Sequence, residues 1–139
     1  MKLHSQHLLL PACALFILAT CLSCNKYSPD EPFPPVYTPS IFTGSNNKIV
    51  YSIDPNTGET KWKTPVDGEV HATPVLFNNS LWVGTTLGTL YQMDYKTGSI
   101  LNTKKFAGPI EGTPLPFNGN LLVPAGQNLL YMNIGDLND

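Results

Sequence analysis

The sequence contains no arginine and little charge of either sign. Of its 139 residues 13% are charged, eight lysines against ten aspartates and glutamates, and the formal net charge is −2. A nucleic-acid-binding surface needs clustered lysine and arginine, so we expect no nucleic-acid partner. The low charge and the 42% apolar content also exclude a charge-rich disordered tail or a long solvated helix.

After residue 24 the sequence has no cysteine and only one histidine, the residues that a metal or catalytic site commonly uses. The three cysteines, Cys13, Cys21 and Cys24, all lie near the amino terminus, so nothing downstream can form an internal disulfide or a thiolate metal site. His71 is the only histidine after His7. Because no metal cluster, phosphate-binding loop or catalytic base stands out, we expect no metal, no cofactor and no enzymatic activity.

Residues 1–23 have the pattern of a secretory signal peptide. One lysine precedes an apolar run from Leu8 to Leu22, which as a helix covers about 22 Å, short of a bilayer core of roughly 30 Å. The following Cys24-Asn25 resembles a bacterial lipoprotein cleavage site, which predicts that Cys24 is the lipidated first residue of the mature protein. Cleavage before Cys21, or a signal peptide without lipidation, are the alternatives.

Residues 24–32 are polar and begin a proline-rich stretch. Such chain is extended at about 3.1 Å per residue, so we expect a tether between the lipid and the folded domain. Several acyl chains on Cys24 would anchor the protein to a membrane. This predicts an outer-membrane lipoprotein of the bacterial cell envelope that faces either the periplasm or the cell surface.

The chain carries an internal repeat of 40 residues. Residues 41–80 align with residues 81–120 without a gap, and a third copy begins at Leu121. A period near 40 residues indicates a propeller or a helical array. The first two copies share ten identical positions: Gly44/Gly84, Tyr51/Tyr91, Asp54/Asp94, Thr57/Thr97, Gly58/Gly98, Gly68/Gly108, Thr73/Thr113, Pro74/Pro114, Phe77/Phe117 and Asn78/Asn118. The third copy keeps Leu81/Leu121, Val83/Val123, Leu90/Leu130 and Tyr91/Tyr131, and a partial copy occupies 33–40.

The composition favours the propeller. Thirteen prolines and eleven glycines, spread along the chain, exclude long helices. In the second copy, short segments at 72–77, 81–84, 89–94 and 99–105 are bounded by turn residues, and four such strands make one antiparallel blade. We therefore predict an all-β chain of four-stranded β-propeller blades. The blades are expected at about 33–64, 72–105 and 112–139, an incomplete propeller of about two and two-thirds blades.

One motif connects the repeat to a known family. Ser52-x-Asp54-x-x-Thr57-Gly58-x-x-x-Trp62 resembles the tryptophan-docking motif of the pyrroloquinoline-quinone (PQQ)-like propeller family. The resemblance covers about 33–139. It implies that Asp54, Thr57 and Gly58 shape the turn between the third and fourth strands, and that Trp62 packs against the next blade.

The later copies depart from the motif. The second keeps Asp94, Thr97 and Gly98 but has Asn102 in place of the tryptophan, and the third decays to Met132-Asn133-Ile134-Gly135-Asp136. These departures predict weaker docking of the later blades.

The family resemblance leaves three functions open. The leading hypothesis is a lipid-anchored, non-catalytic scaffold that binds proteins, similar to the propeller lipoprotein of the outer-membrane β-barrel assembly machine. The first alternative is the amino-terminal fragment of a periplasmic PQQ-dependent oxidoreductase. The second is a surface lipoprotein that binds glycans or proteins. Fold likeness alone does not decide among them.

Two loop residues are candidates for partner contact. In this family the segments between blades open near the channel mouth, and His71 and Glu111 occupy equivalent positions in two of them. The predicted blades are too few to close a propeller, so bare faces and strand edges would favour self-association. We expect the chain to be a piece of a longer propeller, and closure by oligomerisation is the alternative.

Overall fold

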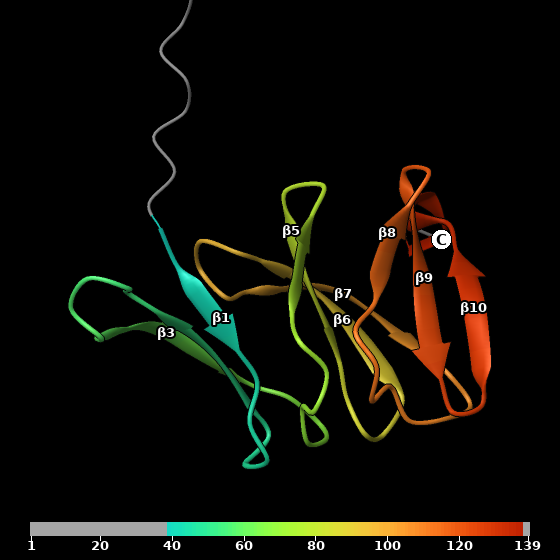
Figure 1. Ribbon diagram of the computed structural model, residues 1–139, viewed down its shortest axis with the longest axis horizontal. Helices are drawn as coiled ribbons and strands as arrows, with labels where there is room; N and C mark the ends of the chain where they lie inside the picture. Colours follow the sequence, from blue (N-terminus) through green and yellow to red (C-terminus); the bar gives the residue numbers. More distant parts are fainter. Residues whose placement is uncertain (1–38, 138–139) are drawn as a thin grey trace, which may run out of the picture. The chain divides into compact units, whose positions relative to one another are not determined.

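The computed structural model describes residues 39–137, which form three antiparallel sheets followed by one short helix (Figure 1). Blade 1 contains β1 (Ile41–Thr43), β2 (Ile49–Ile53) and β3 (Thr60–Pro65). Blade 2 contains β4 (Val75–Phe77), β5 (Ser80–Gly84), β6 (Thr89–Asp94) and β7 (Ile100–Lys105). Blade 3 contains β8 (Leu115–Phe117), β9 (Asn120–Ala125) and β10 (Asn128–Met132), and the 3-10 helix η1 (Ile134–Leu137) comes after it.

The all-β prediction of propeller-like blades is confirmed. Blade 2 has the four strands expected of it, and each strand pairs with its neighbour along the chain. The part of blade 1 expected at 33–38 lies outside the described residues, as do Cys24 and the predicted signal peptide and tether. Within residues 39–137, no helix has the length and hydropathy to cross a membrane.

The hydrophobic core lies between the sheets, because blade 2 buries one face against blade 1 and the other against blade 3. Alternating side chains along β5 and β6 point to opposite faces, which explains why all five residues of β5 are buried. Between blades 1 and 2 the buried side chains are Val50, Val70, Leu81, Val83, Tyr91 and Met93. Between blades 2 and 3 they are Trp82, Leu90, Ile110, Leu121, Val123, Ala125 and Met132.

The third copy does not follow the gapless 40-residue alignment. In blade 2, Val83 pairs with Tyr91, whereas in blade 3 its counterpart Val123 pairs with Leu130. The alignment of Tyr91 with Tyr131 as equivalent repeat positions is therefore wrong. Leu130 is the residue of blade 3 that occupies the place of Tyr91 in the sheet. The cause is the β9–β10 hairpin, which is one residue shorter than the β5–β6 hairpin.

The corrected register recovers a turn that the sequence alignment missed. Asn133, not Ile134, is the counterpart of Asp94. Oδ1 of Asn133 accepts a hydrogen bond of 3.0 Å from the backbone N–H of Gly135, as Oδ1 of Asp94 accepts one of 2.8 Å from Lys96. The third copy thus keeps the Asx turn, but the chain then enters η1 instead of returning as a fourth strand.

Candidate binding site

The connections between blades bring three ionisable side chains together. His71 lies between β3 and β4, and Glu111 lies between β7 and β8. Nε2 of His71 is 2.9 Å from Oε2 of Glu69, and Nδ1 is 3.8 Å from Oε1 of Glu111. The side chains of His71, Glu69 and Glu111 are 40%, 46% and 62% exposed. The structure therefore places the two residues that the sequence singled out side by side, and adds Glu69 to them.

This group, named here the Glu69–His71–Glu111 cluster, has the character of a contact surface. Two carboxylates flank an imidazole in contact with water, which suits recognition of hydrogen-bond donors or basic side chains on a partner. Exposed ion pairs contribute little to folding stability, so the cluster is free to change partners. Within residues 39–137, no three His, Cys, Asp or Glu side chains are arranged to hold a metal ion.

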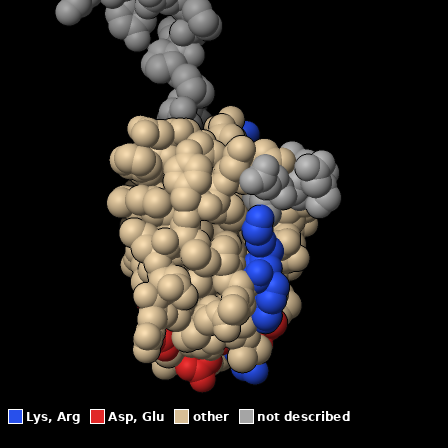
Figure 2. Space-filling model, turned by 90° about the vertical axis from the view of Figure 1, so that its right-hand side faces the viewer, with Lys and Arg blue, Asp and Glu red and all other residues tan. Residues whose placement is uncertain are grey.

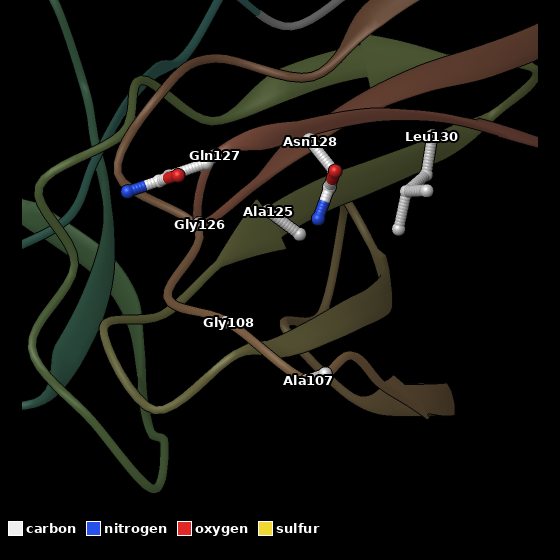
Figure 3. Close-up of a pocket in the computed structure, with 7 residues that line it drawn as sticks. All are labelled: Ala107, Gly108, Ala125, Gly126, Gln127, Asn128 and Leu130. Carbon is white, nitrogen blue, oxygen red and sulfur yellow. The ribbon is translucent and has the colours of Figure 1, made fainter.

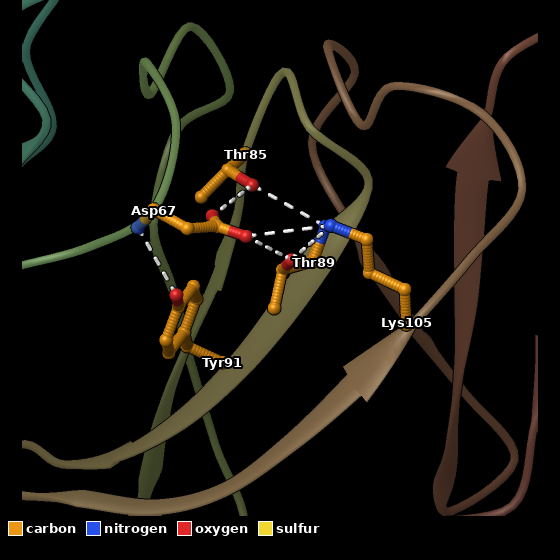
Figure 4. Close-up of polar contacts among 5 residues, drawn as sticks. All are labelled: Asp67, Thr85, Thr89, Tyr91 and Lys105. Atoms are coloured by element: carbon orange, nitrogen blue, oxygen red, sulfur yellow. Dashed lines mark hydrogen bonds and ion pairs between the residues drawn. The ribbon is translucent and has the colours of Figure 1, made fainter.

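A second polar group lies at the join between blades 1 and 2 (Figure 4). Oδ1 of Asp67 accepts a hydrogen bond of 2.8 Å from Oγ1 of Thr85, and Oδ2 accepts one from Oγ1 of Thr89. Nζ of Lys105 lies 3.4 Å from Oδ2 of Asp67 and donates to Oγ1 of Thr89 at 2.9 Å. The backbone N–H of Asp67 donates to the hydroxyl of Tyr91 at 3.1 Å. This Asp67 network fastens the loop after blade 1 to β6 and β7.

The network changes the acidity of its members. Burial raises the pKa of Asp67, but the hydrogen bonds from Thr89, Thr85 and Lys105 outweigh it, so the pKa lies below its ordinary value. Burial, aided by the nearby Asp67 charge, raises the pKa of Tyr91. Asp67 is therefore a carboxylate engaged in holding the loop.

The sequence analysis missed the Asp67 network, although the repeat carries a signal for it. One repeat later, Asp67 and Thr85 are replaced by Ala107 and Ala125. A polar pair that becomes an alanine pair at equivalent positions indicates that the two side chains touch. The repeat comparison indicates which residues change together, but it does not identify the atoms that form the hydrogen bonds.

The alanine pair leaves a cavity between blades 2 and 3 (Figure 3). It has a volume of about 290 Å³. The side chains of Ala125, Asn128 and Leu130 point to the same side of the ribbon, and Gln127 points away from them. The lining residues are Ala107, Gly108, Ala125, Gly126, Gln127, Asn128 and Leu130.

The motif residues hold blade 1 to blade 2. Nε1 of Trp62 donates a hydrogen bond of 3.1 Å to the carbonyl oxygen of Tyr95, and Oγ1 of Thr64 donates one of 2.7 Å to that of Gly98. The indole lies so close to Gly98 that a Cβ atom there would be 2.5 Å from Cε3 of Trp62. In blade 2, Asn102 in the place of the tryptophan instead donates to Oε1 of Gln92 at 3.1 Å.

The motif acids shape turns. Oδ1 of Asp54 accepts hydrogen bonds of 2.8 Å and 3.4 Å from the backbone N–H groups of Asn56 and Thr57. The Asn56 bond is the main cause of the lowered pKa of Asp54. In blade 2, Oδ1 of Asp94 accepts from the N–H of Thr97 at 2.9 Å, which is the main cause of the lowered pKa of Asp94. These carboxylates are occupied by the backbone.

Comparison with known proteins identifies the family. The family model for the outer membrane protein assembly factor BamB matches residues 46–138, well over half of the chain. The chain belongs to this PQQ-repeat family. Among curated proteins, none matches the sequence. The family assignment carries the PQQ-like propeller fold and an association with the cell envelope.

Solved structures share the fold. BamB from Moraxella catarrhalis matches with a TM-score of 0.61 and 20% identity over 70% of this chain and 31% of that one. The quinohemoprotein alcohol dehydrogenase ADHIIG from Pseudomonas putida HK5 matches with a TM-score of 0.59 and 21% identity over 65% and 16%. A europium-containing methanol dehydrogenase matches with a TM-score of 0.55 and 22% identity over 63% and 18%. The chain thus spans less than a third of the length of each.

Proposed function

We propose that this protein is a lipid-anchored β-propeller of the bacterial cell envelope that acts as a non-catalytic protein-binding scaffold in outer-membrane protein assembly. The match of residues 46–138 to the BamB family model is the observation that supports this most strongly. In this proposal Cys24 carries the lipid, and residues 24–32 hold the propeller away from the membrane.

The Glu69–His71–Glu111 cluster is the partner-binding surface in this proposal. The cluster is exposed, and its residues come from the connections after two successive blades. The distance between His71 and Glu111 therefore depends on how those blades pack. Charged groups at the rim of an interface govern association rate and partner choice more than total affinity. A partner surface with basic or amide side chains would complement the two carboxylates.

A second candidate function rests on the likeness to quinohemoprotein alcohol dehydrogenases. In that case the chain would be the amino-terminal part of a periplasmic oxidoreductase that binds PQQ. The two candidates differ in a direct measurement. A scaffold purified from membranes retains no quinone when PQQ and Ca²⁺ are supplied, whereas an oxidoreductase retains it stoichiometrically.

The proposal is tested in cells that lack the gene, by measuring the abundance of outer-membrane β-barrel proteins. We expect the abundance to fall and the wild-type gene to restore it. The double variant His71→Ala/Glu111→Lys should restore it poorly. Glu59→Lys is the matched control, since it makes the same glutamate-to-lysine charge change at an exposed residue in the turn before β3, outside the cluster. Unchanged barrel levels in the deletion strain would contradict the proposal, as would stoichiometric quinone in the purified protein.

A further inference from the structure

Blade 3 exposes an apolar face on the side away from blade 2. The registers of its sheet place Leu115 opposite Leu122, Leu122 opposite Tyr131, and Pro124 opposite Leu129, so these side chains share one face. Leu115, Leu129 and Tyr131 are 58%, 65% and 58% exposed. We name this the trailing face, because it points toward the blade that would come next along the chain.

The trailing face is also free of charge. No lysine, aspartate or glutamate occurs from residue 112 to residue 135. Figure 2 views this side of the molecule and shows an uncharged surface, with lysines along one margin and acidic side chains at the lower margin. A contiguous apolar surface with a charged rim is typical of an interaction site.

Blade 1 exposes a matching surface, the leading face, on the side away from blade 2. Ile41 pairs with Ile53, and Thr43 pairs with Tyr51, so these four side chains share that face. Ile41 is 52% exposed, and the other three are half-buried. Their counterparts in blade 2 are Leu81, Val83, Tyr91 and Met93, which are buried against blade 1. The leading face of blade 1 therefore has the residues of a blade-to-blade contact.

The trailing face of blade 3 lacks a glycine that the two trailing faces before it share. In blades 1 and 2 a glycine leaves a hollow into which the following connection inserts a side chain. A Cβ atom on Gly44 would lie 2.1 Å from Cγ1 of Val70, and one on Gly84 would lie 2.2 Å from Cγ2 of Ile110. In blade 3 the register puts Pro124 at this place. Its ring occupies the hollow that a following connection would need.

A partner without such an inserting side chain fits this face. The residue one repeat before Val70 is Asp30, so the sequence leading into blade 1 offers no apolar side chain there. In addition, the chain after β10 forms η1, and Ile134 packs into the core between blades 2 and 3. Both features suit a blade that arrives from another molecule.

We propose that the trailing face of blade 3 binds the leading face of blade 1 of a second copy, so that copies associate head to tail. The contact brings together the same two kinds of face that meet where blades 1 and 2 join, without the side chain inserted at Gly44. It is heterologous, so each copy keeps one face of each kind for a further contact unless the assembly closes. This inference does not depend on the proposed function.

Two variants that each block one face test the proposal, and the mass of the full-length protein in detergent is measured by light scattering. Leu129→Asp blocks the trailing face, and Ile41→Asp blocks the leading face. Both positions are exposed, so both variants should fold. Leu87→Asp, at a side chain that is 55% exposed between β5 and β6, is the matched control. We expect the wild type and the control to associate, and each blocked variant to be monomeric.

Mixing the two blocked variants gives the decisive result. Each retains the face that the other lacks, so the mixture should form a one-to-one dimer and nothing larger. A wild type that is monomeric at every concentration would overturn the proposal, because the faces would then belong to the protein's own further blades or to another protein. Association that survives either substitution, or a mixture that stays monomeric, would overturn it as well.

Discussion

At the scale of single residues, two glycines with the same backbone conformation have different surroundings. Gly58 and Gly98 both have φ of 74°, and both end an Asx turn, of Asp54 and Asp94 respectively. A Cβ atom on Gly58 meets nothing within 4 Å, whereas one on Gly98 lies 2.5 Å from the indole of Trp62. Gly58 is therefore needed only for the conformation of its turn. Gly98 is needed for its turn and also for the close packing of Trp62 from blade 1.

We predict that Gly98→Ala destabilises the protein more than Gly58→Ala. The left-handed conformation costs an alanine about 1 kcal/mol at either position. At Gly98 the displaced Trp62 and its bond to the Tyr95 carbonyl bring the loss in the free energy of unfolding to about 3 kcal/mol. Urea unfolding of both variants measures the difference. Equal losses would show that the indole does not rest on Gly98.

At the scale of elements, the two joins between blades use different chemistry. Both carry a backbone hydrogen bond from the hairpin to the connection, 2.9 Å from Thr86 to Glu69 and 2.7 Å from Gly126 to Pro109. The first join adds the Asp67 network, whereas the second has alanines and a cavity in its place. A charged, hydrogen-bonded anchor fixes one loop orientation, so we expect the cluster residues next to Asp67 to be held more firmly than Glu111.

The Asp67 network predicts a dependence of stability on pH. Because the pKa of Asp67 is lowered in the folded protein, its contribution is present above the ordinary value of 3.8 and is lost as the pH falls through the folded value. Asp67→Asn should cost about 1–2 kcal/mol near neutral pH, and the difference from wild type should shrink in acid. Thermal unfolding from neutral pH to below 3.8 measures this.

The exposed turn residue Glu59 provides the control for this series. Glu59→Gln should change stability little at any of these pH values, because surface substitutions away from such networks usually have small effects on stability. A gap between wild type and Asp67→Asn that stays constant with pH would mean that the carboxylate charge plays no part in holding the loop.

At the scale of the whole molecule, the proposed scaffold function depends on the amino terminus as much as on the blades. The described residues 39–137 supply sheets, loops and two apolar faces. A scaffold that serves one membrane also needs an anchor, and stable anchoring takes more than one acyl chain. Cys24 is the residue to which we assign that anchor.

We predict that Cys24→Ser abolishes lipidation and releases the protein from the membrane fraction. The intact mass of membrane-extracted wild type should exceed that of the unmodified chain from residue 24 by two or more acyl chains, a mass absent from the variant. Cys21→Ser is the matched control and should leave the acylated mass in place. Acylation that survives Cys24→Ser but not Cys21→Ser would move the cleavage site to Cys21.

The fold and the motif turns could be predicted from the sequence because their causes are local. The 40-residue period, the glycines and prolines that bound each strand, and the alternation of apolar side chains follow from neighbours along the chain. The same repeat placed His71 and Glu111 in equivalent loops, which was enough to nominate both for one surface. Their membership in a partner contact remains a prediction.

What the tertiary structure alone decided are the features that depend on register and on packing between blades. The shift to a 39-residue offset in blade 3 comes from a hairpin one residue shorter, and alternation cannot locate such a deletion when Leu129, Leu130 and Tyr131 are all apolar. The Asp67 network joins residues up to 38 positions apart, and only the packing of blade 1 on blade 2 brings them within hydrogen-bonding distance. The sequence alone determined what each blade is made of, and the contact between blades decided which side chains meet.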